Sequence, residues 1–231
     1  MEMALLDTID YLLLLNRKER FHLLCEALGE TTFRLNERFR TRLQSCLNDS
    51  PRRAVSIPPD AFVAMDCHLD WIGMALRLAA DGPEQAPRDR FPLKNIANEG
   101  LVSGTQQDVD LLVAFPVGAM THLVMIEAKG DTDWRNEQLD KKAARLDRIF
   151  SGERPWRESI TPHFLLMSPT PPTSLKKRGW PSWMMPNGEP LWLRLPLPDD
   201  LVKVTRYDPD RDRRPESYRY LSVDRIGRRM G

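Results

Sequence analysis

Residues 123–126 form an apolar segment that ends directly in Glu127-Ala128-Lys129. Four successive apolar side chains leave no polar face, so a strand with this sequence must be covered on both sides. Such a strand is typical of the middle of a sheet that carries helices on each face. We therefore expect an α/β protein with this segment at its centre.

The segments around this strand alternate between extended and helical patterns. Residues 107–115 and 122–129 are predicted to be neighbouring strands, and the proline and glycine within residues 116–119 suit a hairpin connection. A helix is predicted over residues 134–150 and a further strand over residues 163–167. A hairpin followed by a helix and another strand is the order expected of a layered sheet.

Residues 60–80 are predicted to form a helix that precedes these strands. Asp60 follows two prolines and is a suitable N-cap. Apolar side chains then recur at helical spacing and form one stripe: Val63, Cys67, Trp71, Met74 and Leu78. Residues 4–48 also read as helical, with a break near Gly29.

The chain divides into three expected parts. Residues 1–50 form an N-terminal helical appendage and residues 51–168 the core. Residues 169–231 form a Pro/Trp-rich extension with a basic tail, packed on the core. The prolines of residues 169–198 exclude a long regular element there, whereas the tryptophans argue against disorder. One last strand is predicted over residues 218–223.

Composition narrows the class of protein. The three cysteines form no Cys-x-x-Cys pair, so neither a disulfide framework nor a structural zinc site is expected. No apolar run approaches the roughly 20 residues that span a bilayer, so we expect a cytoplasmic protein without membrane contacts. The net charge of this chain is +1. If the protein binds nucleic acid, its basic groups must therefore be clustered on one face.

Three charged residues meet at the end of the apolar strand. Glu127 and Lys129 point to one face because side chains alternate along a strand. Asp110 on the neighbouring strand brings a second carboxylate, and two adjacent carboxylates repel unless a metal or proton lies between them. Asp110, Glu127 and the Ala128 carbonyl are therefore candidate ligands for Mg²⁺ or Mn²⁺. Lys129 would orient the attacking water or neutralise charge on a phosphate.

Two alternatives stay open for these residues. Asp108 points to the same face as Asp110, and we prefer Asp110 because the apolar run begins immediately after it. The second alternative is a purely structural role: an ion pair between Glu127 and Lys129, with Asp110 as a solvated edge residue. That interpretation does not explain why charges end the most hydrophobic strand of the chain.

The order of Asp110, Glu127-Ala128-Lys129 and a following helix with Gln138 resembles the PD-(D/E)xK phosphodiesterase superfamily. The resemblance covers about residues 60–168. It implies the restriction-endonuclease-like fold, an αβββαβ core with a mixed central sheet, here with N-terminal helices and a Pro-rich C-terminal extension added. It also implies an acidic residue on the first core helix, which is Asp66 or Asp70; we prefer Asp70.

The helix that carries Gln138 also bears Lys142 and Arg145 in one row beside its apolar stripe. This row is either a solvated face or a set of groups that places Gln138 over the metal and both cations on a phosphate backbone.

The resemblance implies a Mg²⁺-dependent nuclease whose partner is nucleic acid, with DNA preferred. The alternative is a catalytically silent nuclease-like fold that acts as a nucleic-acid-binding or protein-assembly module. The N-terminal helices are the candidate surface for a homodimer.

Overall fold

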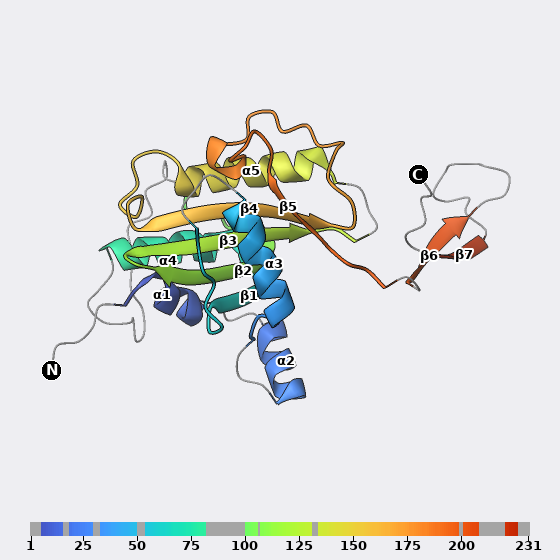
Figure 1. Ribbon diagram of the computed structural model, residues 1–231, viewed down its shortest axis with the longest axis horizontal. Helices are drawn as coiled ribbons and strands as arrows, with labels where there is room; N and C mark the ends of the chain where they lie inside the picture. Colours follow the sequence, from blue (N-terminus) through green and yellow to red (C-terminus); the bar gives the residue numbers. More distant parts are fainter. Residues whose placement is uncertain are drawn as a thin grey trace.

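A five-stranded mixed sheet is the centre of the computed structural model (Figure 1). The structure describes residues 6–15, 19–29, 33–49, 54–81, 100–105, 107–130, 134–198, 201–207 and 220–225. In chain order its elements are α1 (Thr8–Leu15), α2 (Glu19–Leu28), α3 (Glu37–Asn48), β1 (Phe62–His68), α4 (Leu69–Asp81), β2 (Asp108–Val117), β3 (Met120–Ala128), α5 (Asn136–Phe150), β4 (Ile160–Ser168), the 3-10 turn η1 (Ser182–Met184), β5 (Leu191–Arg194), β6 (Val202–Tyr207) and β7 (Tyr220–Arg225).

The strands of the main sheet follow the order β1-β2-β3-β4-β5. The first three are antiparallel, whereas β4 and β5 run parallel to β3. The prediction of a central strand is confirmed, because residues 123–126 lie in β3 and are at most 1% exposed. Gly118, with φ of +61°, lies in the tight turn from β2 to β3, where a left-handed backbone suits glycine.

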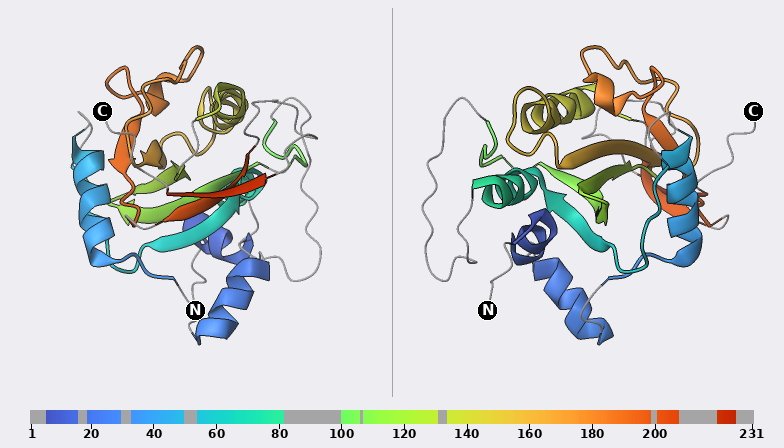
Figure 2. Two further views of the ribbon diagram at one scale, coloured as in Figure 1. Left: turned by 90° about the vertical axis from the view of Figure 1, so that its right-hand side faces the viewer. Right: turned by 60° about the vertical axis from the view of Figure 1, so that its left-hand side comes forward.

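Two apolar clusters cover the two faces of this sheet. One contains side chains of α1, α4 and α5, among them Tyr11, Ile72 and Leu146. The other is built on α3, whose Leu43 and Leu47 are buried. Figure 2 shows α3 on one side of the sheet and α4 on the other. Helices on both faces explain why β3 has no polar side between residues 123 and 126.

The predicted helix over residues 60–80 is wrong in its first half. Phe62–His68 is strand β1, and Asp60 lies in the turn before it instead of capping a helix. The helix begins only at Leu69. The backbone of β1 is satisfied by pairing with β2, a distant partner that outweighs the local helical spacing. Consequently α4 lies between the first and second strands and does not precede them.

The C-terminal extension supplies one strand to the main sheet and a separate ribbon. Strand β5 pairs with β4, with Leu165 opposite Leu191. Trp180 is buried and donates from Nε1 to Asp140 Oδ1 of α5 at 2.8 Å, which fastens this irregular segment to the core. The predicted last strand appears as β7, shifted to Tyr220–Arg225, and pairs with β6 away from the main sheet (Figure 1).

No helix in the described part of the chain is long and apolar enough to cross a membrane.

Candidate metal site at the ends of two strands

Strands β2 and β3 bring Asp110 and Glu127 to the same end of the sheet. The pairing of β2 with β3 ends at Leu111 and Ile126, and Asp110 and Glu127 are the residues that directly adjoin this last pair. The charge of Asp110 is close enough to raise the pKa of Glu127. The Asp110 carboxylate accepts a hydrogen bond from the Ala128 backbone N–H at 2.6 Å. This bond holds the start of β2 against the end of β3. The structure therefore brings together the two carboxylates that the sequence placed on neighbouring strands.

The Glu127 side chain is buried and paired with a lysine from α5. Its carboxylate contacts the Lys142 ammonium, and the two side chains are 4% and 7% exposed respectively. The same ammonium donates to the Asp108 backbone carbonyl at 2.5 Å. Lys142 thus joins α5 to the end of β3 and to the start of β2. The cation paired with Glu127 is therefore Lys142, whereas the alternative considered from the sequence was an ion pair with Lys129.

The electrostatics of Glu127 reflect both its burial and its charged neighbours. The pKa of this carboxyl is raised to about 7, and burial is the largest cause of the rise. The charge of Lys142 and the hydrogen bond from it lower the pKa, Asp110 raises it further, and Lys129 lowers it. Four charged groups, two acidic and two basic, therefore act on one another at this point of the sheet.

Lys129 follows β3 and is half-buried, while Gln138 is exposed in the first turn of α5. Lys129 lies near enough to Glu127 for its charge to lower that carboxyl's pKa. Both side chains therefore remain accessible to solvent, Lys129 beside the two carboxylates and Gln138 on α5.

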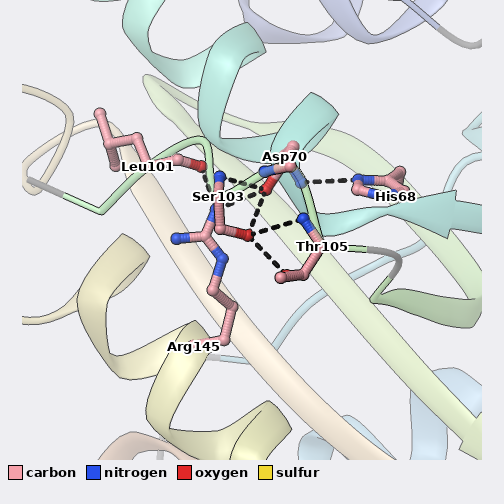
Figure 3. A network of polar contacts seen from close by, with 7 residues as sticks. His68, Asp70, Leu101, Ser103, Thr105 and Arg145 are labelled. Atoms are coloured by element: carbon pink, nitrogen blue, oxygen red, sulfur yellow. Dashed lines mark hydrogen bonds and ion pairs between the residues drawn. The ribbon is translucent and has the colours of Figure 1, made fainter. Parts of the chain in front are cut away.

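Asp70 belongs to a different network, which fastens the loop before β2 (Figure 3). Its carboxylate accepts hydrogen bonds from the backbone N–H groups of Ser103 at 3.1 Å and Gly104 at 2.8 Å. Arg145 Nη2 donates to Asp70 Oδ1 at 2.5 Å and also contacts the Leu101 carbonyl. Burial alone would raise the pKa of Asp70, but these hydrogen bonds and the Arg145 charge lower it.

Neither Asp70 nor Asp66 completes a cluster of three acidic ligands. Within the described ranges, no three His, Cys, Asp or Glu side chains come together in a group that could hold a metal. Asp66 instead occupies β1 with a left-handed φ of 49°, and Asp70 is the buried partner of Arg145. The ligand set is limited to Asp110, Glu127 and backbone oxygens such as that of Ala128.

These residues fit a divalent cation with a small number of protein ligands. Mg²⁺ accepts carboxylate and carbonyl oxygens and keeps several waters, so two carboxylates are sufficient. The Lys142 ammonium already occupies a position between a carboxylate and a carbonyl oxygen, which shows that oxygens converge there on positive charge. Carboxylate and carbonyl oxygens are donors of the kind that Mg²⁺ and Mn²⁺ accept.

Lys142 and Arg145 are the residues whose roles the sequence did not reveal. Both are about 5% exposed, so the expectation that they lie on a solvated face or grip a phosphate backbone is wrong. Their position beside the apolar stripe of α5 was the only local signal. Their acidic partners lie 15 and 75 residues away in the chain, and no local pattern reports such a pairing.

Comparison of the chain with protein-family models, with curated proteins and with solved structures found no match. The assignment of function therefore depends on the residues and geometry described above.

Proposed function

We propose that this protein is a metal-dependent nuclease of the PD-(D/E)xK type, which hydrolyses phosphodiester bonds of DNA with Mg²⁺ or Mn²⁺. The observation that carries the proposal is the proximity of Asp110 to Glu127 at the end of the β2–β3 pairing, with Lys129 two residues after Glu127. An exposed and a buried carboxylate beside a lysine supply the ligands and the cation that phosphodiester hydrolysis requires.

The strand order supports a restriction-endonuclease-like core. The αβββαβ order is obtained with α3 as its first helix, followed by β1, β2, β3, α5 and β4, and with α4 inserted between β1 and β2. In this assignment α3 and α5 cover opposite faces of the sheet. Strands β1 to β3 are antiparallel and β4 returns parallel to β3, as expected for a mixed sheet of this kind.

Each residue has a role that its position permits. Asp110 and Glu127 would hold the cation, together with the Ala128 carbonyl. The bound cation would lower the pKa of a water ligand and stabilise negative charge on the phosphate. Lys129 orients the attacking water or neutralises charge that develops on the phosphate oxygens. Gln138, exposed in the first turn of α5 and one turn before Lys142, would hydrogen-bond the substrate near the cation.

A catalytically silent binding or assembly module is the second candidate. Its support is the Lys142 ammonium, which already neutralises Glu127 without a metal. The net charge of +1 also provides no general attraction for nucleic acid. A module of this kind would keep the fold and the ion pair and would be insensitive to divalent cations.

A cleavage assay on single- and double-stranded DNA and on RNA, with Mg²⁺ or Mn²⁺, separates the two candidates. Asp110→Asn retains an acceptor for the Ala128 N–H and removes the charge, so it tests the ligand without disturbing the strand. We expect Asp110→Asn and Lys129→Ala to lower cleavage by roughly 100-fold or more. Lys141→Ala is the matched control, because Lys141 is an exposed lysine on the same molecule and should be dispensable. Wild-type protein that cuts none of these substrates with either metal would contradict the nuclease proposal.

A further inference from the structure

Lys142 is a buried cation at a position where a surface helix would ordinarily bury an apolar side chain. It lies on α5 directly before Ala143 and three residues after Leu139, both buried in the core. Burying an ammonium ion costs several kcal/mol unless it is well paired. The contacts that offset this cost are the Glu127 carboxylate and the Asp108 carbonyl.

The ligands of this ammonium are those of a divalent cation. A carboxylate and a backbone carbonyl are both hard oxygen donors. A second carboxylate, Asp110, also adjoins the last β2–β3 pair and is close enough to repel Glu127 electrostatically. The ammonium therefore supplies the positive charge that two adjacent carboxylates require in the absence of a metal.

A simple charge count shows what changes when a metal binds. Asp110 and an ionised Glu127 contribute two negative charges, and Lys129 and Lys142 contribute two positive charges, so the four groups then sum to zero. A bound divalent cation would make the same group of residues net positive. That positive charge favours a phosphate anion only after the metal has bound.

We propose that Lys142 is the resident counter-ion of this site, which holds Glu127 in the metal-free protein and releases it when Mg²⁺ or Mn²⁺ binds. This inference rests on the proposed metal-dependent function. Lys142 acts as a positioning residue, since it contacts a metal ligand and a backbone carbonyl. After release, its ammonium keeps the Asp108 carbonyl and contributes its positive charge to the site from a buried position. Metal and Lys142 thus compete for one carboxylate.

The competition predicts that removing the lysine charge tightens metal binding. Two like charges a few ångströms apart at a buried site repel by more than one tenfold step in affinity. Lys142→Met keeps an unbranched apolar side chain of similar length. We expect it to lower the dissociation constant for Mn²⁺ by about tenfold or more. Its metal-free melting temperature should fall, and the rise in melting temperature on adding Mn²⁺ should exceed that of the wild type.

The measurement is the free Mn²⁺ concentration by electron paramagnetic resonance, combined with thermal melts of the full chain. Lys141→Met is the matched control, because it removes the same charge from an exposed position one residue away. It should leave the Mn²⁺ affinity nearly unchanged. A folded Lys142→Met variant that binds Mn²⁺ no more tightly than the wild type would overturn the inference and leave the nuclease proposal standing. Absence of Mn²⁺ binding by wild type and variants would overturn both.

A second measurement applies to the wild type if Lys142→Met does not fold. The ammonium signal of Lys142 in ¹⁵N NMR spectra, assigned by its loss in Lys142→Arg, should be protected from solvent exchange without metal. Saturating Mg²⁺ should shift it or abolish its protection. A Lys142 signal that Mg²⁺ leaves unchanged, in protein whose melting temperature Mg²⁺ raises, contradicts the release of Glu127.

Discussion

Arg145 of α5 donates a hydrogen bond to Asp70 at 2.5 Å, and the two side chains are 5% and 10% exposed. Through this pair, α5 is joined to the first turn of α4 and, through the Asp70 carboxylate, to the loop that leads into β2 (Figure 3). One turn earlier on the same helix face, Lys142 is joined to the ends of β2 and β3. Helix α5 therefore organises the surroundings of the candidate site with two buried cations.

Breaking the Asp70–Arg145 pair should destabilise the protein. Asp70→Ala leaves the Arg145 guanidinium buried without its anion, and loss of one partner of a buried pair costs about 3–5 kcal/mol. Urea denaturation of the metal-free protein measures this change. Glu137→Gln is the control, since it breaks the exposed Glu137–Lys141 pair and should leave the free energy of unfolding nearly unchanged. Equal effects of the two substitutions would contradict a structural role for the buried pair.

The same carboxyl predicts a pH dependence in acid. The pKa of Asp70 lies below its ordinary value of 3.8 in the folded protein. A depressed carboxyl pKa stabilises the fold fully above the unfolded value and ceases to do so as pH falls through the folded value. The melting temperature of the wild type should therefore exceed that of Asp70→Asn at pH 6, and the difference should shrink below about pH 4. A difference that is constant from pH 6 to pH 2 would show that the Asp70 charge contributes nothing.

Removing the Glu127 carboxylate should also destabilise the metal-free protein. From the sequence, loss of one of two repelling carboxylates would leave stability unchanged or higher, but Lys142 reverses that expectation. Glu127→Ala strands the Lys142 ammonium and should cost about 3–5 kcal/mol. The double variant Glu127→Met, Lys142→Met replaces both charges by apolar groups and should recover most of that loss. Additive effects in this double-mutant cycle would mean that the two side chains do not stabilise each other.

Metal binding should raise the melting temperature of the wild type. A ligand at about a hundred times its dissociation constant stabilises the state that binds it by roughly 2.7 kcal/mol. Asp110→Asn should remove most of this gain, because it deletes a hard anionic ligand. Asp108→Asn should remove much less. A wild type indifferent to millimolar Mn²⁺ favours the binding module, and a gain lost only in Asp108→Asn would assign the ligand to Asp108.

At Gly73 we expect the replacement of a helical glycine by alanine to destabilise the protein, although this substitution is ordinarily stabilising. Alanine in a helix interior is ordinarily preferred over glycine by about 1 kcal/mol. A Cβ at Gly73, however, would lie 2.7 Å from the Leu101 carbonyl oxygen, a backbone atom of the loop that Asp70 and Arg145 fasten. Gly73→Ala should therefore lower the free energy of unfolding by about 1–3 kcal/mol. Gly130→Ala, whose Cβ would have its nearest neighbour at 3.9 Å, is the control for an unhindered site.

Local sequence patterns predict the strands and the helix that carry the candidate site. The apolar run of residues 123–126, the turn at Gly118 and the stripe of α5 are local patterns, and each appears in the structure where it was predicted. The adjacency of Asp110 and Glu127 followed from those patterns, because a tight hairpin leaves only one register in which the apolar faces match.

The position of β1 and the roles of the buried cations depend on contacts between distant parts of the chain. Residues 62–68 satisfy helical spacing and strand burial equally, and pairing with β2, some forty residues later in the chain, selects the strand. In the sequence, Lys142 and Arg145 resemble surface residues. In the folded protein they are paired with carboxylates of β3 and α4. Local spacing reports which side chains share a face. It does not indicate which distant group will pair with a buried charge, because the two groups interact only after the helices and strands have packed together.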